Sequence, residues 1–158
     1  AVNLSSLEKN PDYVEAYIPD FQYKLDYYPK ESITKPGYIL GKGTLVNENM
    51  KNGSYMCFIH GDQPMEIIEN YDNQNGKTLM IFKESYGNAF APFLTSHYSK
   101  IIVVDPREFN RDGKPALDLT QFAKEQGVDD LLVINYPYMI NNSYYIAWLG
   151  RLVGYSAS

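Results

Sequence analysis

The residue of this chain best placed for chemistry is Ser85, which stands between an apolar run and an amphipathic segment. The apolar run Thr78 to Lys83 stops just before Glu84, and residues 89–98 follow after a glycine. This order is typical of a strand, a tight turn and a helix. A hydroxyl at the carboxyl end of a strand lies where open α/β sheets bind ligands, which favours a nucleophile. A serine before a helix is equally typical of an N-cap, so both interpretations stay open.

The residues after this serine would assist a nucleophile. The backbone N–H groups of Tyr86 and Gly87 begin the predicted helix, where they and the helix dipole can stabilise an oxyanion. Gly87 also allows a substrate to approach the backbone closely. Asn88 offers either a further donor or a cap for the helix start. Glu84 is not expected to be the base, because adjacent residues at a strand end point to different sides.

A nucleophilic serine needs a base within hydrogen-bond reach, and the chain contains two histidines. His97 is rejected, because a helix rising about 1.5 Å per residue carries it more than roughly 10 Å from the turn. His60 follows the apolar run Tyr55 to Ile59. If that run were a parallel neighbour of the Ser85 strand, His60 would face the same crevice. The alternative interpretation of His60 is a solvated loop residue.

Two further loops carry charges at the edge where substrate is expected. Gly61 and Asp62 follow the first histidine, and Asp105 and Arg107 follow the next predicted strand. Arg107 would either bind a carboxylate or order its own loop. The sequence has no Cys/His cluster of zinc spacing, no Walker loop and no dinucleotide fingerprint. It therefore predicts neither a metal site nor a nucleotide cofactor.

The elements that must position these residues alternate along the chain. Short apolar runs occupy residues 54–59, 78–83, 100–105 and 130–135, and helical patterns follow the last three. This alternation predicts a three-layer α/β fold with a mainly parallel sheet in a single domain, residues 1–158. Two β-prone runs near the start, Tyr13–Ile18 and Phe21–Tyr28, predict an N-terminal antiparallel β pair.

Three smaller elements complete the predicted fold. A short strand is expected near Tyr38–Leu40, within a loop-rich region. Gly127 is expected to end the helix that precedes the last strand. A final amphipathic helix is predicted over Ser143 to Val153, with Trp148 used for packing rather than binding.

Composition excludes several classes of partner. The net charge is −5 and the basic residues are scattered singly, so neither nucleic acid nor an anionic lipid surface is expected. No apolar run approaches the roughly 18 residues that a membrane span needs. The single cysteine, Cys57, lies in an apolar run and is expected to be a small buried hydrophobe. The 15 tyrosines are typical of half-wet surfaces that hold sugars or proteins, with strand edges and core margins as the alternative.

Several consecutive stretches resemble the DHHW family of bacterial proteins, named for an Asp-His-His-Trp motif. The resembling residues are 55–64, 76–88, 92–94, 97–98 and 104–107, with a weaker match at 127–132. That family is similar to the SGNH-type acyltransferases and esterases that include the alginate O-acetyltransferase group. In those relatives a serine after a strand attacks an acetyl ester, and an Asp-x-His segment earlier in the chain supplies the base and its orienting carboxylate.

The resemblance implies a flavodoxin-like SGNH fold and an O-acyltransferase or esterase in which Ser85 is acylated, with no cofactor. It also implies an extracellular or cell-surface location, a cell-surface polysaccharide as substrate and a membrane-bound acyl-transfer partner. Two departures qualify it: Glu84 stands where the family usually has Asp, and no Asp-His or His-Trp pair occurs.

We therefore expect this chain to be the C-terminal portion of a longer protein, inactive by itself. Its start at Ala1 fits that expectation. The alternative is a non-catalytic extracellular carbohydrate-binding or scaffold module in which Ser85 is a helix cap.

Overall fold

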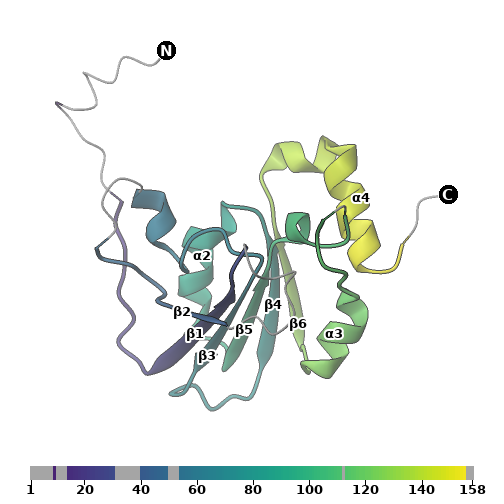
Figure 1. Cartoon of the computed structure of the whole chain (residues 1–158). Coiled ribbons are helices and arrows are strands. Elements are labelled where there is room, and N and C mark those ends of the chain that lie inside the picture. Colours follow the sequence, from purple (N-terminus) through teal and green to yellow (C-terminus); the bar gives the residue numbers. More distant parts are fainter. Residues whose placement is uncertain (1–8, 10–13, 31–39, 50–53, 112, 156–158) are drawn as a thin grey trace.

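A computed structural model of the chain describes residues 9, 14–30, 40–49, 54–111 and 113–155. Within these residues six strands form one sheet in the order β2-β1-β3-β5-β4-β6 (Figure 1). The strands are β1 (Tyr23–Tyr28), β2 (Gly41–Gly43), β3 (Met65–Asn70), β4 (Thr78–Lys83), β5 (Lys100–Val104) and β6 (Asp130–Ile134). The α-helices are α2 (Gly87–Leu94), α3 (Leu119–Glu125) and α4 (Ser143–Leu152), and the 3-10 helices are η1 (Ser54–Cys57), η2 (Pro106–Glu108) and η3 (Pro137–Asn141).

The sheet is mixed, so the prediction of a mainly parallel sheet is wrong. Strands β5, β4 and β6 are parallel to one another. The pairs β3 with β5, β1 with β3 and β1 with β2 are antiparallel. The α/β character and the strand, turn and helix around Ser85 are confirmed.

The error in strand direction begins with the apolar run at residues 54–59, which is not a strand. Its first part forms η1, and Phe58 makes only an isolated bridge with Val46. The strand that occupies the sheet is β3, where Glu66 and Glu69 interrupt the apolar pattern. Both faces of β3 are covered over much of its length. Because the strand contains a buried charged residue, a search for continuous apolar runs does not identify it.

The predicted N-terminal β pair is also wrong in its pairing. Residues 14–20 are described and contain no strand, whereas β1 forms within the second run as predicted. The antiparallel partners of β1 are β2 and β3, which lie later in the chain. Of the short strand expected near Tyr38–Leu40, residues 38 and 39 lie outside the described residues, and β2 begins just after, at Gly41.

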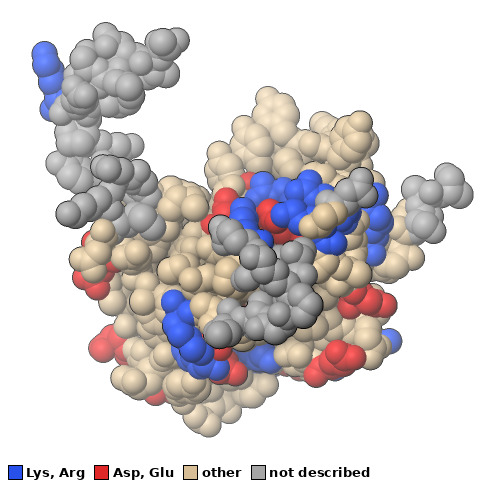
Figure 2. Space-filling view, in the orientation of Figure 1, with Lys and Arg blue, Asp and Glu red and all other residues tan. Residues whose placement is uncertain are grey.

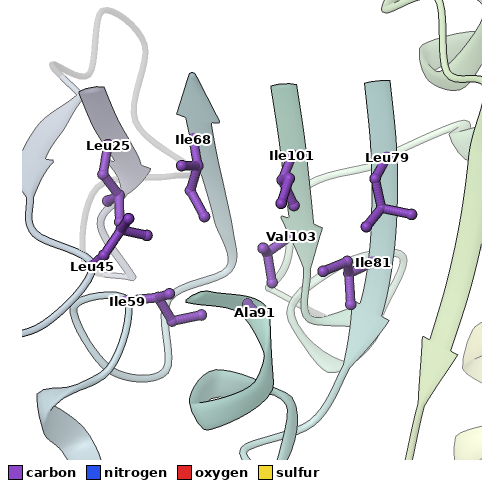
Figure 3. Packing of buried hydrophobic residues seen from close by; sticks show 9 residues of the cluster. All are labelled: Leu25, Leu45, Ile59, Ile68, Leu79, Ile81, Ala91, Ile101 and Val103. Atoms are coloured by element: carbon purple, nitrogen blue, oxygen red, sulfur yellow. The ribbon is translucent and has the colours of Figure 1, made fainter. Parts of the chain in front are cut away.

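Apolar side chains cover both faces of the sheet and join it to the helices. On one face Leu79, Ile81 and Val103 pack with Ala91 of α2 (Figure 3). On the other face Met80 and Phe82 belong to a second cluster that includes Leu119 of α3 and Leu152 of α4. The alternation of side chains along a strand places neighbouring residues of β4 in different clusters. The described part of the chain thus has three layers, with α2 opposite α3 and α4 (Figure 1).

The later helices agree with their sequence signals. Helix α3 ends at Glu125, and Gly127 follows with φ of 63°, a left-handed conformation that glycine adopts without strain. Helix α4 spans Ser143–Leu152 as predicted. Trp148 packs edge-on against Tyr145 and lies under the guanidinium of Arg111 at 5.0 Å, which confirms a packing role. Cys57 is buried, as expected.

Candidate functional site

The carboxyl ends of the parallel strands β4 and β5 lie side by side at one edge of the sheet. The chain leaves β4 toward α2 on one face and leaves β5 toward η2 and α3 on the other. Neighbouring parallel strands whose connections depart to opposite faces leave an opening between their carboxyl ends, where α/β proteins bind ligands. Ser85 follows one of these strands, and Asp105 and Arg107 follow the other.

The turn that carries Ser85 is held by backbone hydrogen bonds. Gly87 N donates to Glu84 O at 2.9 Å, and Asn88 N donates to Ser85 O at 3.2 Å. The Tyr55 hydroxyl, from η1, donates to the same Ser85 oxygen at 2.8 Å. The N-cap of α2 is Tyr86, and no side chain caps the helix. The interpretation of Ser85 as the helix cap is therefore wrong, and its partly exposed side chain has no capping role.

The backbone donors expected to bind an oxyanion are partly engaged within this turn. The N–H of Gly87 is used by Glu84 O, and Tyr86 N lies 3.5 Å from Glu84 Oε2, at the weak limit of a hydrogen bond. Gly87 also has a packing reason to be glycine. A Cβ there would lie 2.3 Å from Lys83 Cβ, so only glycine lets the first turn of α2 lie this close to β4.

A buried polar group lies beneath the turn. Asn88 is fully buried and donates from Nδ2 to Asp62 Oδ1 at 2.8 Å, so it links α2 to the loop before β3 rather than capping the helix. Lys83 Nζ, also fully buried, lies 3.4 Å from the same oxygen. Burial opposes the charge of Asp62, but the Lys83 ammonium and the Asn88 hydrogen bond outweigh it and hold the pKa of Asp62 below its usual value.

Glu66 of β3 extends this buried group. Its side chain is fully buried, and Gln63 N donates to its Oε1 at 3.4 Å. Burial raises the pKa of Glu66 to about 8, against the opposing influence of the Lys83 charge. Glu66 Oε2 and Asn88 Oδ1 are buried and have no hydrogen-bond partner among the described residues. At neutral pH the carboxyl is therefore mainly protonated.

Asp105 and Arg107, which follow β5, form an ion pair with each other. Fully buried Asp105 accepts from Arg107 Nε at 2.9 Å, from Nη2 at 2.6 Å and from its backbone N at 3.0 Å. The hydrogen bonds to Asp105 raise the pKa of Arg107 above its usual range, and the charges of Asp62 and Glu84 add to the effect. Arg107 therefore orders its own loop through Asp105, and its predicted place at the substrate edge stays a prediction.

The end of β6 joins the same edge. Tyr136 N donates to Glu84 Oε1 at 2.9 Å, which ties the loop after β6 to the Ser85 turn. The Tyr145 hydroxyl, reaching over from α4, donates to Asn135 Oδ1. Burial raises the pKa of Tyr145, so this hydroxyl remains a donor throughout the physiological range. The edge thus collects polar groups from β4, β5, β6 and α4.

Exposed aromatic rings lie beside the serine. The rings of Tyr86 and Tyr136 stack with centroids 5.2 Å apart and an interplanar angle of 17°. Tyr138 continues the series, with its centroid 5.3 Å from that of Tyr136. All three side chains are exposed. Stacked rings of this kind offer an apolar face and a polar hydroxyl to a ligand.

Neither histidine lies in this group. The His60 ring stacks on Tyr27 of β1, with centroids 4.3 Å apart. Because β1 and β4 are separated by two strands, that stack lies about 14 Å from the Ser85 strand. His60 and its neighbour Gly61 belong to a turn with positive φ at both residues rather than to a strand end. His97 lies beyond α2, where Asn75 Nδ2 donates to its carbonyl at 2.6 Å, at the opposite edge of the sheet.

Several members of the site escaped prediction. Asn135 carries a usable signal, since it is the last residue of a predicted strand run and directly follows the observed strand β6, whose carboxyl end lies beside that of β4. Tyr145 and Tyr55 have no such signal, because they reach the edge from α4 and from η1, both distant in sequence from the strand ends. Lys83 and Glu66 were concealed because charged residues are seldom fully buried.

On the face that Figure 2 shows, acidic atoms lie beside and between the basic ones. No three or more His, Cys, Asp or Glu side chains of the described residues are arranged to hold a metal ion. Each helix in the described ranges is too short or too polar to cross a bilayer.

Known structures with a similar fold are about twice as long as this chain. The crystal structure of a DHHW family protein from Eubacterium siraeum DSM 15702 matches 98% of this chain with a TM-score of 0.70 and 27% identity, and the match covers 47% of that protein. PatB1 from Bacillus cereus matches 76% of this chain with a TM-score of 0.58 and 18% identity, over 38% of its own length. A PatB1 structure with a sulfonyl adduct gives 17% identity, the same TM-score, and coverage of 75% and 40%.

The likeness to PatB1 concerns the fold alone, since identity is below one fifth. No curated protein sequence matches the chain. The profile of the DHHW protein family, by contrast, matches residues 1–104, which is about two thirds of the chain and includes Ser85 and its helix. The chain belongs to the DHHW family.

Proposed function

We propose that Ser85 is the nucleophile of an acyl-transfer site, and that the protein containing this chain is an O-acyltransferase or esterase. The observation that carries the proposal is the position of Ser85 after the carboxyl end of β4, a strand parallel to its neighbour β5. Its turn is held by backbone hydrogen bonds, and its side chain does not cap α2. Hydroxyls at such strand-to-helix turns are suited to attack a carbonyl carbon. The DHHW family match supports the assignment.

The proposed reaction begins with attack of Ser85 Oγ on the carbonyl carbon of an ester. The new C–O bond forms as the hydroxyl proton passes to a base, and the bond to the departing alcohol then breaks as that alcohol takes the proton. The acyl group next passes to a sugar hydroxyl or to water, which restores the serine. Tyr86 N–H is the backbone donor best placed for the oxyanion, because its contact with Glu84 Oε2 is long at 3.5 Å.

The base in this proposal comes from outside the chain. His60 stacks on β1 and His97 lies at the opposite edge of the sheet. The relative from E. siraeum is about twice as long as the region it shares with this chain, so a histidine from a further segment is the natural candidate. This chain alone would then transfer acyl groups very slowly.

The substrate and setting follow from the family resemblance. We propose a cell-surface polysaccharide as acceptor, a membrane-bound partner as acyl donor, and an extracellular or cell-surface location. A sulfonyl adduct has been solved on PatB1, a protein of similar fold, and such adducts form when an activated nucleophile attacks the electrophilic sulfur of a sulfonyl reagent and displaces its leaving group. Gly61, Asp62, Asp105 and Arg107 would frame the substrate edge in this proposal, with His60 at its far side.

Labelling with a fluorophosphonate tests the proposal. Protein expressed from the complete gene and protein of residues 1–158 would each be treated, and the modified residue located by peptide mass spectrometry. We expect label on Ser85 in the full-length protein and at least tenfold less in the chain alone. Ser85→Ala should abolish the label, whereas Ser96→Ala, an exposed serine after α2, should not. Folded full-length protein that leaves Ser85 unlabelled would refute the nucleophile assignment.

A second candidate function is non-catalytic carbohydrate binding. The observation that favours it is the exposed row of three rings in which Tyr86 stacks on Tyr136 and Tyr138 lies tilted beside Tyr136. A sugar ring can stack on the open face at an end of such a row. Intrinsic fluorescence titrated with a panel of oligosaccharides distinguishes the two functions. A saturable change that survives Ser85→Ala and is lost in Tyr136→Ala supports binding without catalysis, and unchanged spectra across the panel argue against it.

A further inference from the structure

The Tyr55 hydroxyl contacts two backbone groups at the start of α2. It donates to Ser85 O at 2.8 Å. The N–H of Ala89, the third residue of α2, acts on the same hydroxyl as a hydrogen-bond donor. The first N–H groups of a helix have no carbonyl partner within the helix, so a hydroxyl from elsewhere in the fold can satisfy one of them. A side chain of η1 thus joins the carbonyl before the helix to an N–H of its first turn.

The segment that carries Tyr55 is fixed by contacts of its own. Asn47 N donates to Cys57 O at 2.8 Å, which ties the end of η1 to the preceding loop. Phe58 is buried and packs edge-on against the Tyr55 ring, with the ring centroids 6.0 Å apart. The hydroxyl therefore reaches the Ser85 turn from an anchored segment.

The carbonyl that Tyr55 holds belongs to the same peptide unit as the Tyr86 N–H. Peptide bonds of the described residues are all trans, and a planar trans peptide unit points its C=O and its N–H in opposite directions. Tyr55 and the backbone N of Asn88 both donate to Ser85 O, so the direction of this carbonyl is fixed. The Tyr86 N–H must therefore point away from the side on which the Tyr55 hydroxyl lies.

The same hydrogen bond strengthens the Tyr86 N–H as a donor. A hydrogen bond accepted by a carbonyl polarises its peptide unit, and successive hydrogen bonds strengthen one another. Burial raises the pKa of Tyr55 above its ordinary value of 10.0, against the opposing influence of the Ala89 N–H. The Tyr55 hydroxyl therefore stays protonated, and remains a donor, at neutral pH.

We propose that Tyr55 is a positioning residue of the acyl-transfer site, and that its hydroxyl holds the Ser85–Tyr86 peptide unit so that the Tyr86 N–H faces the oxyanion. This role rests on the proposed function, because an oxyanion forms only if Ser85 attacks an ester. Tyr55 acts through the backbone and does not touch the reacting atoms, since Ser85 O takes its hydroxyl proton.

The variant Tyr55→Phe tests the role, because it removes the hydroxyl and keeps the ring. Hydrolysis of 4-nitrophenyl acetate by the protein expressed from the complete gene gives kcat and KM. Loss of one oxyanion donor typically lowers kcat by about 10²–10³, so a donor that is present but no longer held should lower it roughly tenfold. We expect this fall in kcat with KM unchanged, because the N–H binds charge that develops only in the transition state.

Tyr71→Phe is the matched control. Tyr71 is exposed and directly follows β3, whose carboxyl end lies at the opposite edge of the sheet because β3 is antiparallel to β5. This variant should leave kcat and KM unchanged. An equal fall in kcat in the two variants would overturn the proposal.

A purely structural role for Tyr55 predicts a different result. If the hydroxyl only ties η1 to α2, Tyr55→Phe would unfold at lower urea concentration, while kcat of the folded protein would match that of the unmodified protein. Rates are therefore measured at a temperature where circular dichroism shows both proteins fully folded. An unchanged kcat under that condition would overturn the proposal.

Nuclear magnetic resonance reports the backbone geometry without reference to activity. In Tyr55→Phe the carbonyl ¹³C resonance of Ser85 should move upfield as a hydrogen bond is lost, and the Ala89 amide should exchange at least tenfold faster. Tyr71→Phe should change neither signal. If both signals are also unchanged in Tyr55→Phe, the hydroxyl does not hold this peptide unit and the inference is wrong.

The outcome for the nucleophile is read separately. Unmodified full-length protein that leaves Ser85 without fluorophosphonate label refutes the proposed function, and the positioning role falls with it. Labelled Ser85 together with an unchanged kcat in Tyr55→Phe refutes the positioning role alone.

Discussion

Asp62, in the loop before β3, accepts a hydrogen bond from Asn88, the second residue of α2, at 2.8 Å. The two residues belong to segments that are distant in sequence. The sheet brings these segments to the same edge. The bond therefore fixes the start of α2, and with it the Ser85 turn, to the loop that opens β3. Lys83, buried at the end of β4, shares the same carboxylate oxygen at 3.4 Å.

Replacing Asp62 by Ala should destabilise the fold. The change leaves the buried Lys83 ammonium and the Asn88 amide without this partner, which costs about 2–4 kcal/mol in comparable buried pairs. Urea unfolding of residues 1–158 measures the loss. Asp20→Ala is the control, because Asp20 is exposed and substitutions at such sites usually stay within about 0.5 kcal/mol. Similar losses in the two variants would show that the buried link is unimportant.

Replacing Arg107 by Ala should destabilise the chain through Asp105. The carboxylate of Asp105 is fully buried and receives three hydrogen bonds from Arg107, so removing the guanidinium leaves a buried charge without its main partner. We expect a loss of about 3 kcal/mol, measured by urea unfolding near neutral pH. Arg151→Ala, at an exposed position of α4, provides the matched control. If Arg107 mainly recognises substrate, its removal would leave stability unchanged, contrary to this prediction.

The strand, turn and helix around Ser85 could be predicted because the local signals agree. Thr78–Lys83 is apolar, fully buried and short, and Gly87 begins a helix that the sequence continues. The same logic predicted β5 and β6. Local pattern, burial and turn chemistry agree in these segments. Such agreement allows the structure of a segment to be predicted from its sequence.

Strand direction and the buried charges could not be predicted, because both depend on contacts distant in sequence. Glu66 lies in a strand that pairs with β1 and β5, and its burial is set by those neighbours rather than by its own segment. The apolar run Tyr55–Ile59 looks like a strand, yet Tyr55 bonds to Ser85 and Ile59 packs into the core from a turn. Candidate site residues after β4 and β5 were found by their place at a strand end. Tyr145 was not, because it reaches the site from a helix.

Gly87→Ala should destabilise the chain more than a similar change at an open glycine. A Cβ at Gly87 would lie 2.3 Å from Lys83 Cβ, so α2 must move away from β4. Such overpacking costs about 1–3 kcal/mol. Gly127→Ala, where φ is 63° and no atom lies within 4 Å of the added carbon, should cost only about 1 kcal/mol from its backbone conformation. The free energies of unfolding in urea compare them, and a larger loss at Gly127 would contradict the packing argument.

The stability of the chain should fall as pH rises through the range where Glu66 is protonated only in the folded state. Burial raises the pKa of Glu66 to about 8 in the fold, whereas its ordinary value is 4.5. Between these values the folded state binds the extra proton, so each pH unit costs up to about 1.4 kcal/mol of unfolding free energy, and the loss ends above pH 8.

Glu66→Gln isolates this contribution, because glutamine is nearly isosteric with the protonated carboxyl and does not titrate. Urea unfolding at pH 5, 6, 7 and 8 should show a smaller decline in the variant than in the unmodified chain, with the difference growing toward pH 8. Glu69→Gln is the matched control on the same strand, because the Glu69 side chain is partly exposed. Its Oε2 atom lies 3.5 Å from Lys24 Nζ. Its pH dependence should follow that of the unmodified chain. Parallel curves for Glu66→Gln and the unmodified chain would mean that Glu66 ionises normally, and that the buried group beneath Ser85 is charged rather than neutral.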